Sequence, residues 1–268
     1  MPHPQVRHIP TSYGAIDVVT SGQTSHHFPR HFHENFPFGV VEAGVLGFNY
    51  RGEKLAAWQG TINLANPGEV HDGFPMDGGG WCYRMFYVGN SFLQAVMDTQ
   101  HETAFPWFRS GVIRDTLLAG NIARLHRQIQ ANTLTPLAIE NELFSLLTNM
   151  VQKYSYRRIP EPPAGGCHAS LQAACEMMRA GDDQTLTLQS LANVCGFSSG
   201  YFIRAFRSQY GMTPHQYQLL CRIQRARQQI LQGEPLSQAA IKNGFVDQSH
   251  FNHVYKQFYG YTPGKLAI

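Results

Sequence analysis

Three histidines in the first third of the chain have a residue type and spacing that could bind a small molecule or a metal ion. His31 and His33 lie two residues apart, so they point to the same face of an extended strand. His71, further along the chain, is the third of these histidines, and imidazole nitrogens are common metal ligands. The same imidazoles could instead anchor a ligand by hydrogen bonds or serve the structure alone.

A second group of side chains, near the C-terminus, has the types that read base edges in DNA. Phe251, Val254, Tyr255 and Phe258 recur with the period of an amphipathic helix and should face a core. Arginine pairs with guanine in the major groove, and asparagine or glutamine pairs with adenine. The opposite face of this helix, which we therefore expect to contact DNA, carries Gln248, Ser249, Asn252, His253 and Lys256.

An internal repeat supplies a second face of the same kind. A shift of 48 residues matches Ala192, Gly196 and Phe197 to identical residues, and a shift of 49 matches Phe202 and Gly211. Each copy predicts a helix, a glycine turn and a second helix, with N-caps at Thr187, Ser198, Ser237 and Asp247. The face of the first copy that corresponds to the DNA face holds Ser199, Gly200, Ile203, Arg204 and Arg207.

The helix between the copies is expected to set their separation. It should run from Leu219 to Gln232, with Ile223 inward and Arg225 more exposed. A separation of about one DNA turn, roughly 34 Å, would place both recognition helices in successive major grooves.

Two kinds of secondary structure should position these groups. Residues 5–90 contain short apolar runs separated by turn signals, which is typical of a β-sandwich or barrel. Helical spacing follows, and two antiparallel helices are expected at 114–131 and 137–154. Proline and glycine then concentrate in a stretch that predicts a linker. The expected fold is therefore α+β with two domains: residues 1–158, the linker 159–166, and an all-α domain 167–268.

Charge and composition favour a globular protein with a DNA-binding C-terminal part. Residues 166–268 carry 9 Lys+Arg and 5 Asp+Glu, a net charge of +4, whereas residues 1–165 carry 12 and 13. A local basic excess favours a polyanionic partner. No apolar run is long enough for a membrane span, and the N-terminus lacks the apolar core of a signal peptide. We therefore expect no membrane partner and a cytoplasmic protein.

Enzymatic and disulfide-based functions find little support in the sequence. No phosphate-binding loop of the G-x-x-x-x-G-K-[ST] type occurs, and we do not expect an enzyme. A disulfide framework or a cysteine zinc site is also not expected, because the cysteines are odd in number and scattered: Cys82, Cys167, Cys175, Cys195 and Cys221.

Three stretches between about 168 and 264 carry a family resemblance: LANVCGFSSGYFIRAFRSQYGMTPHQY, RIQRARQQIL and NGFVDQSHFNHVYKQFYGYTP. They resemble the AraC/XylS family of bacterial transcription regulators. The resemblance implies seven helices, two helix-turn-helix units, and base contacts from Gly200, Ile203, Arg204, Gln248, Ser249 and His253.

Three features of the C-terminal region depart from that pattern. Asn243 stands where the family usually has an apolar residue, His253 stands where arginine is frequent, and the chain ends with Lys265-Leu-Ala-Ile. We therefore expect the second copy to bind DNA more weakly or with a different selectivity.

The N-terminal region resembles the small cupin barrel that serves this family as an effector domain, through Phe28-Pro-Arg-His-Phe-His-Glu34 and Asn66-Pro-Gly-Glu-Val-His71. Enzyme cupins bind iron, manganese or zinc through two or three histidines and a carboxylate, so the resemblance would make His31, His33 and His71 the histidines and Glu34 or Glu42 the carboxylate. The full enzyme-type spacing is incomplete here, however, and regulators with this pattern commonly lack a metal, so we expect no metal and no cofactor. The resemblance implies a small-molecule pocket at the barrel mouth. Its candidate effector-binding residues are Arg30, His31, His33, Phe38, Trp58, His71, Trp81 and Tyr83.

The leading hypothesis is a sequence-specific transcriptional regulator whose N-terminal barrel senses a small molecule and controls DNA binding or activation by the C-terminal domain. The expected partners are double-stranded DNA, a small-molecule effector, a second copy of the chain through the helices at 114–131 and 137–154, and RNA polymerase if the regulator activates transcription. Two alternatives stay open: a metal-dependent cupin enzyme fused to a DNA-binding module, and a constitutive regulator whose N-terminal domain only dimerises.

Overall fold

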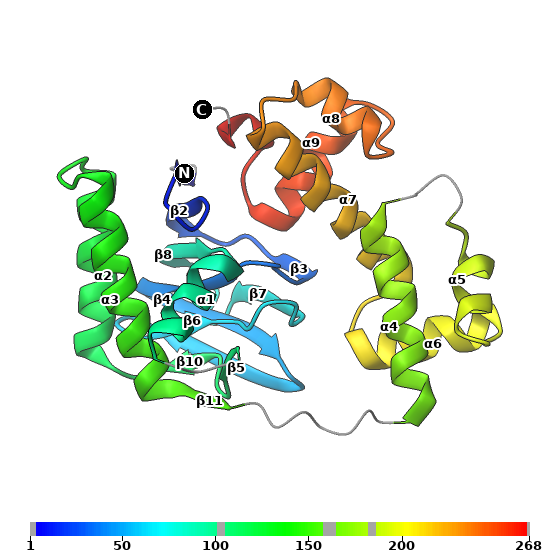
Figure 1. Ribbon diagram of the computed structural model, residues 1–268, viewed down its shortest axis with the longest axis horizontal. Coiled ribbons are helices and arrows are strands. Elements are labelled where there is room, and N and C mark those ends of the chain that lie inside the picture. The colour runs from blue at the N-terminus through cyan, green and yellow to red at the C-terminus, as the bar shows by residue number, and fades with distance from the viewer. Residues whose placement is uncertain (1–3, 101–104, 158–164, 182–185, 267–268) are drawn as a thin grey trace. The chain divides into compact units, whose positions relative to one another are not determined.

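The computed structural model describes residues 4–100, 105–157, 165–181 and 186–266, which fall into two compact units, Met1–Arg158 and Ile159–Ile268. The first unit combines a sheet with helices and the second unit is helical, which is the predicted two-domain α+β architecture (Figure 1). The strands are β1 Gln5–Ile9, β2 Ile16–Thr24, β3 Phe28–His31, β4 Phe36–Tyr50, β5 Glu53–Trp58, β6 Ile62–Leu64, β7 His71–Pro75, β8 Trp81–Val88, β9 Pro106–Phe108, β10 Val112–Ile113 and β11 Ser155–Arg157.

The long strand β4 folds the sheet over itself because its two halves pair with different neighbours. The first half lies between β8 and β6, whereas residues 45–50 pair with β5 and β7. Between the halves, Glu42 is an extra residue in the pairing with β8, and such a bulge bends the strand and shifts its side-chain alternation. Gly44 follows at a φ of +72°, where a Cβ would lie 2.0 Å from the Gly80 carbonyl oxygen.

The folded sheet encloses one apolar cluster and presents another to helices. Within the described residues, the strand path β1-β2-β8-β4-β6-β10 does not close on itself, so the predicted barrel is an open, folded-over sheet. The outer face includes Phe36, Phe38 and Phe86. The interior, hereafter the inner cluster, consists of Val19, Val41, Leu46, Phe48, Tyr50, Ala57, Ala65, Trp81, Tyr83 and Met85.

Three helices share the outer core with the sheet: α1 Asn90–Thr99, α2 Thr116–Gln130 and α3 Pro136–Tyr154 (Figure 1). The last two occupy the stretches in which the sequence predicts helices. Side-chain caps from Asp115 and Thr135 start them. Their periodic apolar residues, which the sequence suggested for a dimer interface, are buried within the protomer: Leu118, Ile122, Leu125, Ile129, Leu143, Leu146 and Leu147.

A polar network fastens α2 to the sheet. The Arg84 guanidinium on β8 lies 2.6 Å from the Glu42 carboxylate and donates to Gln130 at 3.2 Å. Buried His126 donates from Nε2 to the Val19 carbonyl at 3.1 Å, and its Nδ1 faces Arg84. Burial, reinforced by the charge of Arg84, lowers the pKa of His126 to about 4, so this ring is neutral near pH 7.

The second unit contains the two expected helix-turn-helix units, α5–α6 and α8–α9. Its helices are α4 Gly165–Ala180, α5 Leu188–Val194, α6 Ser199–Tyr210, α7 Pro214–Leu231, α8 Leu236–Lys242, α9 Gln248–Tyr259 and the 3-10 helix η1 Pro263–Leu266. Positive φ values at Gly196 and Gly244 make the turn within each unit, as the repeat predicts.

Helix boundaries in this unit are partly as predicted. Side-chain caps at Thr187, Ser198 and Asp247 are confirmed. The cap predicted at Ser237 is wrong, because α8 begins at Leu236 directly after Pro235, whose fixed φ suits a helix start.

The connecting helix and the linker also differ from the prediction. The helix α7 begins at Pro214 and not at Leu219, because Thr213 and Gln216 form a capping box. Residues 159–164 of the predicted linker lie outside the described residues, and Gly165 and Gly166 already belong to α4.

The described part of the chain contains no helix that is both long and apolar enough to span a membrane. Four of the cysteines, Cys82, Cys175, Cys195 and Cys221, are not in disulfide bonds.

Candidate functional site

Strand pairing brings the three predicted histidines together. His31 ends β3 and lies directly opposite His71, the first residue of β7. The ring of His33, two residues further on, has its centroid 4.7 Å from that of His31 and 5.2 Å from that of His71. One nitrogen from each ring lies within 4.8 Å of the other two. These three side chains form what we call the histidine cluster.

Main-chain carbonyls orient two of the rings. Nδ1 of His31 lies 2.7 Å from the Pro29 carbonyl oxygen, and Nδ1 of His71 lies 3.0 Å from the Glu69 carbonyl oxygen. A carbonyl oxygen only accepts, so each Nδ1 carries the proton and each neutral ring has its lone pair on Nε2. The Nε2 atoms of His31 and His33 are 3.1 Å apart and form a hydrogen bond, in which the Nε2–H of His33 donates to the lone pair of His31.

The histidine cluster is largely shielded from water, and two of its three rings are held in the neutral form by burial. His31 is buried, while His33 and His71 are half-buried. Burial, with a smaller contribution from His71, lowers the pKa of His31 to about 3, and burial also lowers the pKa of His71. Ring nitrogens that converge in this way can exchange hydrogen bonds with a ligand or, in the unprotonated form, coordinate a metal ion.

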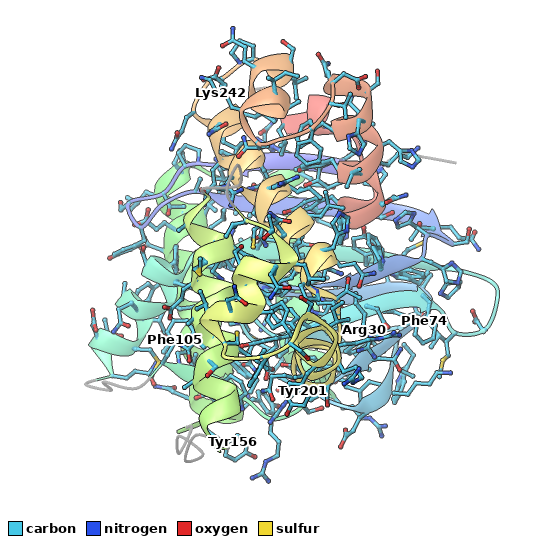
Figure 2. The ribbon with its side chains drawn as sticks, turned by 90° about the vertical axis from the view of Figure 1, so that its right-hand side faces the viewer. Arg30, Phe74, Phe105, Tyr156, Tyr201 and Lys242 are labelled. Atoms are coloured by element: carbon cyan, nitrogen blue, oxygen red, sulfur yellow. The ribbon has the colours of Figure 1, made fainter. Side chains whose placement is uncertain are left out.

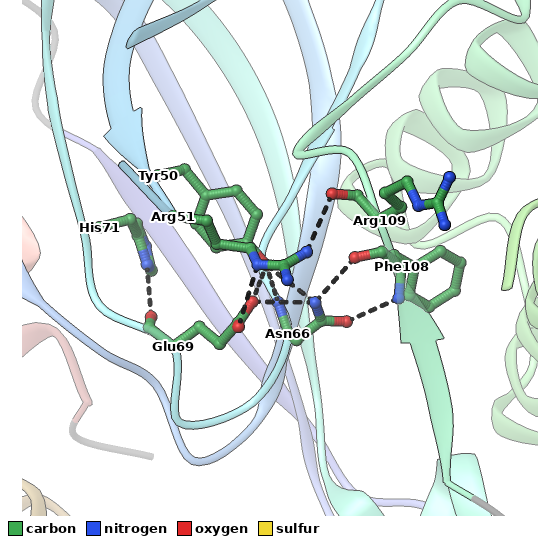
Figure 3. Close-up of polar contacts among 7 residues, drawn as sticks. All are labelled: Tyr50, Arg51, Asn66, Glu69, His71, Phe108 and Arg109. Carbon is green, nitrogen blue, oxygen red and sulfur yellow. Dashed lines mark hydrogen bonds and ion pairs between the residues drawn. The ribbon is translucent and has the colours of Figure 1, made fainter. Parts of the chain in front are cut away.

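A buried polar network holds the loop that carries His71 (Figure 3). The amide nitrogen of Asn66 donates to the Tyr50 hydroxyl at 2.8 Å and to the Phe108 carbonyl at 2.9 Å. Its amide oxygen accepts the Phe108 N–H at 2.9 Å. The Tyr50 hydroxyl donates to the Glu69 carboxylate, and Tyr50 is also the β4 residue paired with His71. The loop is thereby tied to two strands.

The same loop also fixes His33. The main-chain N–H of Gly68 donates to the His33 carbonyl at 2.7 Å. Gly68 adopts a φ of +78°, where other residues are strained. The sequence signalled this loop as a turn, but it gave no sign that Tyr50, Asn66 and Glu69 would support the histidines.

Two of the aromatic residues predicted to bind effector lie in the interior. Trp81 and Tyr83 belong to the inner cluster, with 1% and 6% of their surface exposed. The ring of Phe28 connects this cluster to the histidines, since its centroid is 6.2 Å from Trp81 and 6.3 Å from His31.

The other predicted effector residues point elsewhere. Phe38 lies on the helix-covered face of β4, because the bulge after Val41 changes which side chains face inward. Trp58 is 38% exposed, and the Arg114 guanidinium lies 4.4 Å from its ring. Arg30 is exposed on β3 (Figure 2), next to His31, where successive side chains alternate between faces.

Neither candidate carboxylate joins the histidines. Glu34 is exposed, and Glu42 is paired with Arg84. Across the residues with described side chains, the group with metal-ligand spacing at this place is His31, His33 and His71.

The second helix of the first helix-turn-helix unit, α6, has the predicted division into a buried and an exposed face. Phe202 and Phe206 are fully buried. A Cβ at Gly200 would lie 3.7 Å from an Arg204 guanidinium nitrogen, so the absent side chain leaves room beside that arginine. Among the predicted DNA contacts, Gly200, Arg204 and Arg207 are exposed, and Ser199 and Ile203 are half-buried.

The second helix of the other helix-turn-helix unit, α9, has the same division. The four apolar residues assigned to the core, Phe251, Val254, Tyr255 and Phe258, are buried. On the opposite face Gln248, Ser249, His253 and Lys256 are exposed, and Asn252 is half-buried.

The unusual Asn243 has a structural explanation. Its amide nitrogen donates to the Gln229 side chain and to the Ala239 carbonyl, both at 2.8 Å, and its oxygen accepts from Arg225 at 3.4 Å. Arg225 also donates to the Met178 carbonyl at 3.0 Å. Asn243 therefore links α8 to α7, and half-buried Arg225, which the sequence placed on a more exposed face, continues the link to α4.

Family models match both units of the chain. The AraC-like ligand binding domain matches residues 13–147, and a helix-turn-helix domain matches residues 191–267. The chain belongs to the AraC family. It is an AraC-family transcriptional regulator with a ligand-binding N-terminal domain and a DNA-binding helix-turn-helix domain.

Curated relatives of this AraC-family chain are bacterial regulators. It is 28% identical over 228 residues to the HTH-type transcriptional regulator YbfI of Bacillus subtilis, covering 83% of this chain and 81% of YbfI. It is 38% identical over 84 residues to LumQ, a probable transcriptional regulator of Photobacterium leiognathi, covering 31% and 34% of the two chains.

Solved structures of ToxT from Vibrio cholerae share the fold of this AraC-family chain. An apo form of a ToxT variant superposes with a TM-score of 0.61 at 11% identity, over 97% of this chain and 98% of ToxT. ToxT bound to an unsaturated fatty acid gives a TM-score of 0.52 at 11% identity, over 97% and 92%.

Proposed function

We propose that this regulator binds its effector at the histidine cluster, with Trp81 and Tyr83 of the inner cluster beside it. The observation that supports this proposal is the convergence of three imidazoles at the edge of a buried aromatic cluster. Buried polar groups that converge next to apolar rings are the usual composition of a small-molecule site. Phe38, Trp58 and Arg30 are left out of the site because they point away from the interior.

We propose that α6 and α9 enter the major groove of double-stranded DNA. Base contacts are assigned to the exposed Arg204, Gln248, Ser249 and His253, with Gly200 allowing close approach and Ile203 offering an apolar contact. Arg207 and Lys256, one turn further along their helices, suit phosphate contacts. Ser199 on α6 and Asn252 on α9 are the remaining residues of the two proposed DNA-binding faces. We also propose that the effector-binding domain spans residues 1–158 and that the DNA-binding domain spans residues 167–268.

The chain acts, in this proposal, by binding and not by catalysis. The pattern G-x-S-x-G, which in hydrolases places a serine nucleophile between a strand and a helix, does occur at residues 196–200. Here Ser198 lies between two helices, and its hydroxyl accepts the Tyr201 N–H as an N-cap. RNA polymerase is a further partner in this proposal if the regulator activates transcription. Because the regulator acts on DNA, we also propose that it works in the bacterial cytoplasm.

We further propose a homodimer formed through the outer surfaces of α2 and α3. The apolar side chains left for such contact are Leu117 and Leu137, which are 72% and 68% exposed. The full chain should sediment as a dimer at micromolar concentration, and the double variant Leu117→Ser with Leu137→Ser should shift it towards monomer. A monomeric wild type would contradict this interface.

The effector site can be tested by thermal unfolding of the full chain in the presence of a small-molecule library. All three tryptophans, Trp58, Trp81 and Trp107, lie in the first unit, so their fluorescence reports its unfolding alone. An effector should raise this unit's Tm, because ligands stabilise the state that they bind. The variant His33→Ala should lose the shift and keep its affinity for operator DNA without effector. A shift of equal size in that variant would place the effector elsewhere.

A further inference from the structure

We propose that the histidine cluster binds one divalent transition-metal ion through the Nε2 atoms of His31, His33 and His71. This inference deepens the proposed function, because it names a ligand for the same site. It rests on how the strands place the three rings and on the groups that orient them.

The spacing of the rings is close to that of a metal centre. Zinc–imidazole bonds of about 2.0–2.1 Å separate two ligand nitrogens of a tetrahedral ion by about 3.3 Å. The Nε2 atoms of His31 and His33 are 3.1 Å apart, and all three ligand nitrogens lie within 4.8 Å of one another.

The surroundings of the rings are those of a pre-organised metal site. Metal-binding histidines usually donate their second ring N–H to a carbonyl or carboxylate, which fixes the tautomer and the ring plane. His31 and His71 do so through Nδ1, to Pro29 and to Glu69 respectively. The third residue is held through its main chain, because the Gly68 N–H donates to the His33 carbonyl.

The donor set selects a class of metal. Three imidazoles without a carboxylate suit zinc, nickel, cobalt or copper better than magnesium, calcium or manganese, which prefer oxygen ligands. Three protein ligands also leave a coordination position for water or for an oxygen atom of an effector. The register between β3 and β7 thus brings three histidine ligands together, although the sequence spacing of enzyme cupins is incomplete in this chain. This ligand set does not include Glu34 or Glu42.

The test is a metal titration of the full chain after removal of metals with a chelator. Co²⁺ serves as the probe, because its visible absorption reports coordination, and Zn²⁺ serves as its competitor. We expect one equivalent of either ion to bind with a Kd below about 1 µM. The single variants His33→Ala and His71→Ala should each weaken binding at least tenfold, since removing a direct ligand costs at least as much as removing a supporting group. Exposed His27, four residues before His31, provides the matched control His27→Ala, which should bind like wild type.

Folding of each variant is checked by tryptophan fluorescence, and the half-buried His33 offers the milder substitution His33→Gln if alanine unfolds the domain. Absence of binding in the wild type, or equal binding in the wild type and in folded His33 and His71 variants, would overturn the metal inference. The proposed function is tested separately, because a small molecule that raises the Tm of metal-free protein would keep the effector site even if no metal binds.

Discussion

Replacing Arg204 by alanine should weaken binding of the full chain to its preferred DNA site by about 1–3 kcal/mol, or about 5- to 150-fold, and relax the preference at one base pair. Arg204 is exposed on α6 beside Gly200, where no side chain blocks its approach to DNA. Its guanidinium can donate two hydrogen bonds to guanine, and alanine can donate none. Selection of binding sites from random duplexes, followed by titrations at fixed salt, measures both effects.

Arg207 on the same helix provides the contrast. If it contacts phosphate, Arg207→Ala should weaken all sequences alike and lower the salt dependence by about one unit of slope. The exposed Lys242, at the end of α8 and outside both predicted DNA faces, provides a control for loss of positive charge through Lys242→Ala. Unchanged base preference in Arg204→Ala would remove Arg204 from the set of base-reading residues.

Replacing Asn66 by alanine should destabilise the first unit by about 3 kcal/mol or more and abolish its response to ligand. Asn66 is 1% exposed, and its side chain forms hydrogen bonds with the Tyr50 hydroxyl and with the main-chain carbonyl and N–H of Phe108. Each buried polar group left without a partner costs about 1–3 kcal/mol. The loop that carries His71 would also lose its attachment to β9.

Urea unfolding followed by tryptophan fluorescence measures this effect in the first unit of the full chain. Asn121, exposed on α2, gives the matched control Asn121→Ala, for which we expect a change within about 0.5 kcal/mol. Affinity for DNA in the absence of effector should persist in Asn66→Ala, since the DNA-binding helices form a separate compact unit. A loss of stability no greater than in the control would mean that the network does not hold the loop.

Much of the second unit could be predicted from the sequence because its determinants are local. The caps at Ser198 and Asp247, the turn glycines Gly196 and Gly244, and the apolar face of α9 all act within a few residues of the chain. Because the helix-turn-helix unit is repeated, each kind of local determinant occurs twice in the sequence. Asn243 was the exception, since its side chain pairs with Gln229 and Arg225 on α7, and no local pattern reveals a partner on another helix.

In the first unit the sequence determined that strands and two helices would form, and that His31, His33 and His71 were candidates for one site. Only the tertiary structure decided which face was inside, because the extra residue Glu42 in β4 reverses the alternation that the sequence pattern assumes. It also decided that the histidines converge. That result depends on the register of β3 with β7, and register is fixed by contacts between strands that are distant in sequence.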